Sequence, residues 1–163
     1  MSHSTDKINC SSIAIVGAGI AGMTIAAILS KIPSKPNIYV FESDRRDRDQ
    51  GTGFDIHKNG QNVLKKAGVF HKYNDFSRNG SDLMRIYTPD NDKPKFILTM
   101  PKFLQWFFPP TPESNRQELR EALIESVEDN ENIIIKFEHS INEIIQNGKK
   151  AELFGKDINN NNN

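Results

Sequence analysis

Apolar residues fall into short runs along the chain, and the first runs predict a strand, a helix and a second strand. Residues 12–17 (SIAIVG) form a β-branched run with no interior polar residue, a pattern typical of a strand buried on both faces. The segment 20–29 is almost entirely apolar, which indicates a helix buried on most sides. Residues 37–42 (NIYVFE) predict the second strand. A strand, a helix and a strand within about 31 residues predict a βαβ unit with parallel strands.

The later segments predict two helices, one more strand and two hairpins. A helix over 59–68 ends at Gly68, a residue suited to a left-handed helix end. Another helix runs from about 116 to 128, with Asn115 and Glu118 as a capping box. The remaining elements are a strand within 132–138, a hairpin-like pair at 82–89 and 95–100 around a long turn, and a hairpin within 141–154 around Asn147-Gly148. Residues 70–80 favour no single element. The pattern is that of an α/β fold, with a parallel sheet and a hairpin excursion.

Composition narrows the class of protein. The chain has 163 residues, with 21 Lys and Arg against 21 Asp and Glu. Zero net charge argues against a protein that binds nucleic acid or an anionic membrane through a basic surface. The single cysteine, Cys10, excludes an internal disulfide, and no apolar run is long enough to span a membrane. We therefore expect a cytoplasmic protein, with a disordered leader at 1–11, one domain at 12–158 and an asparagine-rich tail at 159–163.

A glycine-rich segment joins the first predicted strand to its helix. The run Gly17-Ala18-Gly19-Ile20-Ala21-Gly22 fits the pattern G-x-G-x-x-G, and Glu42 closes the next strand 20 residues after Gly22. In this context the pattern is the dinucleotide-binding fingerprint of a Rossmann-like fold. Gly17 permits the tight turn, Gly19 leaves room for a pyrophosphate, and Gly22 lets the helix pack closely on the strand. The helix N-terminus, with Ile20 and Ala21 in its first turn, favours the phosphate charges.

Glu42 indicates which dinucleotide the fingerprint would hold. A carboxylate at the end of the second strand accepts hydrogen bonds from a ribose diol and repels a 2′-phosphate. The nucleotide predicted here is therefore NAD or FAD. The alternative is a tight strand-to-helix turn followed by a solvated glutamate.

An arginine begins the predicted helix at 116–128. The apolar stripe of that helix, projected backwards from Leu119 and Leu123, reaches Arg116 and places it on the face toward the core. A cation in the first turn of a helix meets the unfavourable end of the helix dipole. An anionic partner such as a cofactor pyrophosphate would offset that cost. The alternative is an arginine that reaches solvent or pairs with Glu113.

Several segments in order resemble a known family. GAGIAGMTIAAILSK, FES, GTGFDIHKNGQNVLKKAGVF and NRQELREALIESV are similar to the N-terminal half of FAD-dependent aromatic-hydroxylase-type monooxygenases, and most of all to the tetracycline-degrading flavin monooxygenases. The resemblance covers roughly residues 12–158. It implies an FAD-binding domain of an oxidoreductase that hydroxylates a small organic substrate, with NADPH as the reductant.

The resemblance also implies roles for individual residues. Glu42 would hold the adenosine ribose of FAD, and Asp55 and Arg116 would be further FAD contacts. Arg48 falls where related enzymes have an arginine implicated in NADPH recognition.

Two departures from the family lie in the same loop. Ser43 stands where an arginine commonly follows the ribose-binding acid, and the loop before Asp55 is slightly shorter. Arg45 or Arg46 could therefore take the place of Arg48, and the alternative for the whole loop is a solvated charged turn.

The remaining candidate residues have weaker support for a functional role. His57 has no ligand partner at metal-binding spacing, so we expect a structural histidine that forms hydrogen bonds. Trp106 and its phenylalanine neighbours are either part of a substrate wall or core, and aromatic clusters are more often core. No residue is assigned a catalytic role, and no metal is expected.

The resemblance further implies that the chain is truncated at its C-terminus. Family enzymes continue through a strand that returns to the flavin, a Gly-Asp motif and a substrate-binding sheet, and none of these follows here. We therefore expect weak FAD binding and little hydroxylation by this chain alone. The alternatives are a non-catalytic dinucleotide-binding module, an inactive remnant, or an NAD-dependent dehydrogenase that shares the glycine loop. An exposed apolar sheet would mark either a site for a partner chain or an aggregation liability.

Overall fold

A computed structural model describes residues 10–48, 51, 53–78, 83–89, 91–99 and 112–158 of the protein. The predicted tail at 159–163, most of the predicted leader and the aromatic segment around Trp106 lie outside these residues. No helix in the described ranges is both long and apolar enough to cross a lipid bilayer.

A parallel sheet of three strands organises the fold. The strands are β1 (Ser12–Val16), β2 (Asn37–Phe41) and β7 (Ile133–Lys136), in the order β1-β2-β7. Ile15 pairs with Val40 and Val40 with Ile135, so the three strands are in parallel register. The predicted βαβ unit with parallel pairing is confirmed. It places the C-terminal ends of β1 and β2 side by side.

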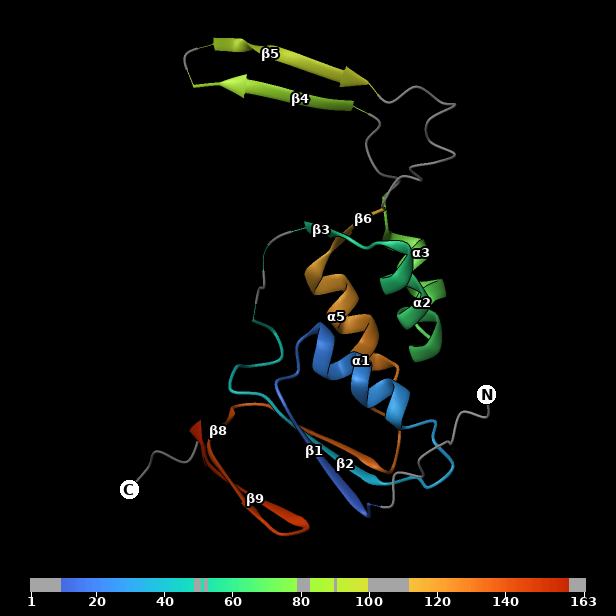
Figure 1. Cartoon of the computed structure of the whole chain (residues 1–163), viewed down its shortest axis with the longest axis vertical. Coiled ribbons are helices and arrows are strands. Elements are labelled where there is room, and N and C mark those ends of the chain that lie inside the picture. The colour runs from blue at the N-terminus through green and yellow to red at the C-terminus, as the bar shows by residue number, and fades with distance from the viewer. Residues whose placement is uncertain are drawn as a thin grey trace.

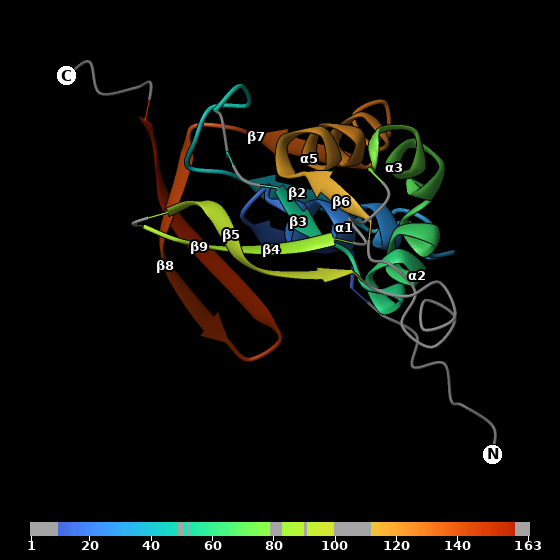
Figure 2. The same cartoon turned by 90° about the horizontal axis from the view of Figure 1, so that it is seen from above.

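Helices cover one face of this sheet (Figures 1 and 2). They are α1 (Ile20–Leu29), α2 (Lys58–Ala67), α3 (Phe70–Phe76) and α5 (Arg116–Glu125). The buried core between sheet and helices includes Met23, Ala26, Ile38, Val40, Leu119, Leu123 and Ile124. Helix α1, which follows the glycine-rich segment, packs on both α5 and α2. It therefore lies at the centre of the helical layer. The predicted end of α2 at Gly68 is confirmed, because Gly68 has a φ of 85° and caps the helix.

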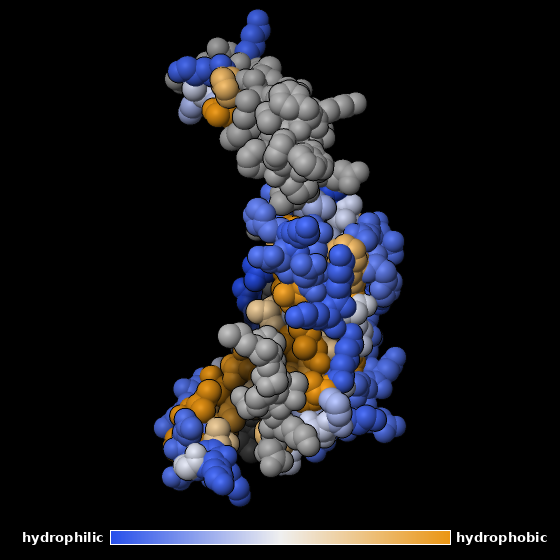
Figure 3. Space-filling model, turned by 45° about the vertical axis from the view of Figure 1, so that its right-hand side comes forward, coloured by the Kyte–Doolittle hydropathy of each residue, from blue (hydrophilic) through white to orange (hydrophobic). Residues whose placement is uncertain are grey.

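The opposite face of the sheet is open where Val16 and Ile134 lie. Their side chains are 53% and 46% exposed. The prediction that residues 12–17 are buried on both faces was therefore wrong, because the helices of the described ranges lie on one side only. Apolar side chains gather in the hollow beside the β8–β9 hairpin (Figure 3).

Three antiparallel pairs complete the fold. They are β3 (Gly53–Asp55) with β6 (Glu113–Asn115), β4 (Leu83–Thr88) with β5 (Asn91–Thr99), and β8 (His139–Asn147) with β9 (Lys150–Asp157). The β4–β5 pair lies at the far end of the molecule from β8–β9 (Figure 1). Both predicted hairpins are thus confirmed as pairings.

Their turns differ from the prediction. β5 begins at Asn91, which pairs with Thr88, so the turn between β4 and β5 is short. Pro94 inside β5 is compatible with this because both strands of an isolated pair are edges, where a missing N–H is tolerated. In the second hairpin Asn147 is still paired with Lys150, and Gly148, with a φ of 60°, opens the turn. The turn is therefore one residue later than predicted.

Candidate cofactor site

The glycine turn between β1 and α1 depends on two glycines. Gly17 has a φ of 102°, a conformation that side-chain-bearing residues rarely adopt, and its N–H donates to the Phe41 carbonyl at 2.7 Å. A Cβ on Gly22 would lie 1.9 Å from the Gly17 carbonyl oxygen. Both predicted roles, the tight turn and the close helix packing, follow from this geometry. Together they bring the N-terminus of α1 to the C-terminal edge of the sheet.

The N-terminus of α1 offers free backbone donors. Gly19 is the N-cap residue, no side chain caps the helix, and no acidic residue lies in its first turn. Within the described residues, no acceptor binds the backbone N–H groups of Gly19, Ile20 and Ala21. A Cβ on Gly19 would meet no atom within 4 Å, so the space beside it is open. Free amides at a helix N-terminus next to open space fit an anion such as a phosphate.

Glu42 follows β2 and is bound to the glycine turn. Its side chain is only 9% exposed, and Oε2 accepts a hydrogen bond of 2.8 Å from the Ala18 N–H. Oε1 accepts from the Asp44 N–H at 2.9 Å and from Ser43 Oγ at 3.2 Å. A carboxylate has about four lone-pair sites, so Glu42 keeps capacity for one more donor. Ser43, the departure from the family pattern, thus helps to orient the carboxylate.

The arginines of the loop after β2 are all paired. Arg48 forms an ion pair with Asp44, and Arg45 lies 3.5 Å from Asp47. These two pairs are local to the loop. The expected NADPH contact at Arg48 therefore concerns a side chain that already has a carboxylate partner.

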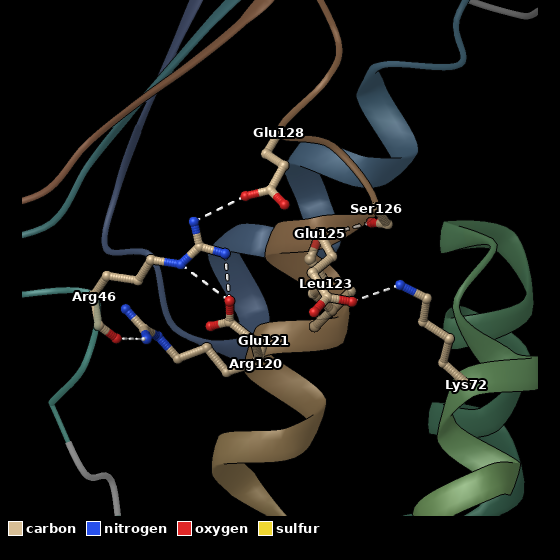
Figure 4. Close-up of polar contacts among 8 residues, drawn as sticks. All are labelled: Arg46, Lys72, Arg120, Glu121, Leu123, Glu125, Ser126 and Glu128. Atoms are coloured by element: carbon tan, nitrogen blue, oxygen red, sulfur yellow. Dashed lines mark hydrogen bonds and ion pairs between the residues drawn. The ribbon is translucent and has the colours of Figure 1, made fainter.

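Arg46 instead reaches α5 (Figure 4). It binds Glu121, and it binds Glu128 with 2.8 Å between Nη1 and Oε2. The hydrogen bond that Arg46 donates to Glu121, and after it the one that Arg46 donates to Glu128, raise the pKa of Arg46. These ion pairs join the loop after β2 to α5 and to the residues that follow it.

Asp55 and Arg116 are brought together by the β3–β6 ladder. Asp55 pairs with Glu113 and Gly53 with Asn115, and Arg116 follows directly as the first residue of α5. The two segments that the family resemblance assigns to FAD therefore lie on neighbouring strands.

The predicted orientation of Arg116 was wrong. Arg116 is exposed, and it forms no ion pair with a described residue. The reason is that α5 begins at the β3–β6 ladder, and its contribution to the core starts one turn later, at Leu119. One of the two hydrogen bonds of the predicted capping box is present: Asn115 Oδ1 accepts from the Gln117 N–H at 2.8 Å. The second bond, from the Asn115 N–H to the Glu118 side chain, is absent among the described contacts.

A polar pocket of about 300 Å³ adjoins this ladder. Its lining comes from β3, the end of α3 and the residues just after it, β6 and the first turn of α5: Gly53, Phe76, Arg78, Glu113, Ser114, Asn115 and Glu118. His57, by contrast, is exposed at the start of α2, and its ring makes no hydrogen bond with a described residue. The expected structural role of His57 is therefore not supported.

Arg120 is the residue that the sequence analysis missed. Its side chain is 0% exposed; Nε donates to the Ala18 carbonyl at 2.9 Å and Nη1 to the Arg46 carbonyl at 2.7 Å. The sequence does contain a signal for this buried arginine, because Arg120 lies between Leu119 and Leu123 on the apolar stripe of the helix. A charged residue inside such a stripe indicates a buried cation with specific partners.

Solved structures with a similar fold include flavin-dependent monooxygenases. No family model matches the chain. The chain spans about a third of the length of these proteins. Because identities are below 25%, the likeness establishes a shared fold.

Three of these structures show the range of sequence identity and structural similarity. Tetracycline destructase Tet(51) is 22% identical over 91% of this chain and 36% of its own, with a TM-score of 0.63. PqsL of Pseudomonas aeruginosa, described as a probable FAD-dependent monooxygenase, is 16% identical over 86% of this chain and 36% of its own, also at 0.63. PieE, a flavin-dependent monooxygenase in complex with FAD and substrate, is 13% identical over 90% of this chain and 28% of its own, at 0.75. The resemblance stated from the sequence is thereby confirmed at the level of the fold.

Proposed function

We propose that the chain is a Rossmann-like FAD-binding portion of a flavin-dependent monooxygenase. The observation that carries the proposal is the buried hydrogen bond between the Ala18 N–H and Glu42. It holds an acceptor for ribose hydroxyls beside a helix N-terminus whose amides are free, which is the arrangement that an adenine dinucleotide requires.

Each part of FAD has candidate partners on this chain. The pyrophosphate would lie at the N–H groups of Gly19, Ile20 and Ala21, with Gly17 and Gly22 shaping the turn. The adenosine ribose would donate to Glu42. Asp55 and Arg116, on the β3–β6 side, would contact the flavin half of the cofactor.

The chemistry would come from the cofactor. FAD, when bound, supplies electron transfer and reaction with oxygen, and the protein supplies binding, orientation and exclusion of water. The full activity, hydroxylation of a small organic substrate, is proposed for a protein in which this portion is completed. NADPH as reductant, with Arg48 as its contact, stays a prediction. A cytoplasmic location and a partner chain on the open sheet also stay predictions.

The proposal is tested by binding FAD and ADP to the protein and to two variants. Flavin absorbance that stays with the protein through desalting would support it. Asp55→Ala and Arg116→Ala should lower the affinity for FAD and leave that for ADP unchanged, because the proposal puts only the flavin half of the cofactor near these two residues. Lys58→Ala, an exposed lysine on α2, is the matched control.

Two outcomes would count against the proposal. A folded protein that takes up no FAD at saturating concentration would overturn it. Equal affinity of the wild type and both variants for FAD, with tight binding of NAD, would favour the dehydrogenase alternative instead.

A further inference from the structure

Arg120 is a buried cation in the core of the candidate site. Its side chain is the largest of the fully buried ones in the described ranges, and no described carboxylate pairs with it. Its guanidinium carbon lies 5.6 Å from the centre of the Phe137 ring, and Nη2 is buried and has no hydrogen-bond partner among the described residues. Burial of a charge without a counter-ion is costly, and an apolar residue of similar volume is often as stable. The position of Arg120 therefore calls for an explanation other than core packing.

The two carbonyls that Arg120 binds belong to the two loops of the cofactor site. Ala18 lies in the glycine turn after β1, and Arg46 lies in the loop after β2 that also carries Glu42. Ala18 is held at both of its backbone groups: its N–H by Glu42 and its carbonyl by Arg120. One side chain of α5 thus sets the position of both loops.

The hydrogen bond from Arg120 to the Ala18 carbonyl also determines the direction in which the next N–H, that of Gly19, points. The chain has no described cis peptide, and in a trans peptide the C=O and the N–H point to opposite sides. The N–H of the Ala18–Gly19 peptide belongs to Gly19, and it points away from the buried Arg120. Among the described residues no acceptor binds this N–H, and a Cβ built on Gly19 would meet no atom within 4 Å.

We propose that Arg120 is a positioning residue that aims the Gly19 N–H at a phosphate of the bound dinucleotide. The inference rests on the proposed function for its ligand. It goes further by assigning a role to a residue that cannot touch the cofactor. Without Arg120 the Ala18–Gly19 peptide can rotate, and a phosphate then loses one aligned donor.

The test compares ligands with and without phosphate on two variants of Arg120. Arg120→Met removes all donors and keeps an apolar side chain, whereas Arg120→Lys keeps one donor. Loss of one hydrogen bond to a charged group should weaken ADP and FAD binding by about tenfold or more in Arg120→Met. Arg120→Lys should recover part of that loss. Adenosine, which has no phosphate, should bind all forms equally.

A matched control separates positioning from stability. Leu123→Ala lies on the same buried face of α5 and destabilises the core without removing a donor. At temperatures well below its unfolding midpoint it should bind ADP like the wild type. The Gly19 amide signal in NMR should move on addition of ADP in the wild type and in Leu123→Ala, and should move less in Arg120→Met.

The outcomes distinguish the two proposals. If the wild type binds ADP but no FAD, and Arg120→Met loses ADP affinity, the inference is supported and the flavin proposal fails. If Arg120→Met binds ADP and FAD like the wild type, the inference is overturned while the flavin proposal stands. If the wild type binds neither ligand, both are overturned. Should Arg120→Met fail to fold, Arg120→Lys and the Gly19 signal decide the matter.

Discussion

Glu42 and Ala18 lie 24 residues apart in the chain and are joined by a buried hydrogen bond of 2.8 Å. The bond connects the loop after β2 to the turn after β1, at the edge where both strands end. The carboxylate therefore stabilises the fold and is oriented for a ligand at the same time. Changes at Glu42 should affect both properties.

Replacement of Glu42 by glutamine tests this double role. Both carboxylate oxygens accept from N–H or O–H donors, so the amide NH2 of Glu42→Gln must face a donor. We expect the free energy of unfolding to fall by about 1–3 kcal/mol, with weaker binding of ADP. Urea unfolding followed by circular dichroism measures the first effect. Glu131→Gln, an exposed glutamate, should change neither quantity; equal stability of Glu42→Gln and the wild type would contradict the prediction.

Two glycine substitutions in one loop should have opposite consequences. Gly22→Ala places a methyl group 1.9 Å from backbone, so the helix must shift, and we expect a loss of about 1–3 kcal/mol or more. Gly19→Ala meets no atom within 4 Å, so its melting temperature should match the wild type. Its methyl group instead enters the space proposed for the pyrophosphate and should weaken ADP binding. Thermal unfolding and ADP titration of both variants give the comparison, and a stable Gly22→Ala would show that the helix packing is less tight than described.

The parts of the site that depend on local sequence were predictable. A tight turn next to a buried helix needs glycine at Gly17 and Gly22, and an acid closing the next strand stands out at Glu42. These requirements act within one βαβ unit, so the spacing of a few residues reveals them. The end of α2 at Gly68 was predictable for the same reason.

The parts of the site that depend on packing between distant segments could not be predicted from the sequence. The exposure of Arg116 follows from where α5 joins β6, and the role of Arg120 follows from two carbonyls in loops far away in sequence. Helical spacing alone places both arginines near the apolar stripe. Only the packed structure separates the one that is buried from the one that is not.

Tyr73 should report on the charge of Asp55. Burial, and then the negative charge of Asp55, raise the pKa of Tyr73 above the ordinary value of 10.0. The folded protein therefore keeps this proton at a pH where the unfolded chain has lost it. Its contribution to stability is complete below pH 10 and is lost as the pH rises through the folded-state pKa. Asp55→Asn should lower the pKa of Tyr73 and leave it above 10, because burial remains.

The measurement is the alkaline titration of tyrosinate absorbance. The chain has three tyrosines, so Tyr73→Phe identifies the signal by difference. Asp75→Asn, a change of charge on α3 without a described effect on Tyr73, serves as the control. If Asp55→Asn leaves the titration unchanged, Asp55 does not lie close enough to Tyr73 for its charge to act.

The ion pairs of Arg46 should contribute modestly and in a salt-dependent way. The Arg46 side chain is 43% exposed, and exposed pairs are worth up to about 1 kcal/mol each. Arg46→Gln should therefore lower the free energy of unfolding by about 1 kcal/mol at low salt, and by less at high salt, where charges are screened. Arg45→Gln, which removes one pair whose side chains are 70% and 75% exposed, should have a smaller effect. An equal loss for Arg46→Gln at both salt concentrations would contradict the prediction, because screening must reduce any loss that comes from exposed ion pairs.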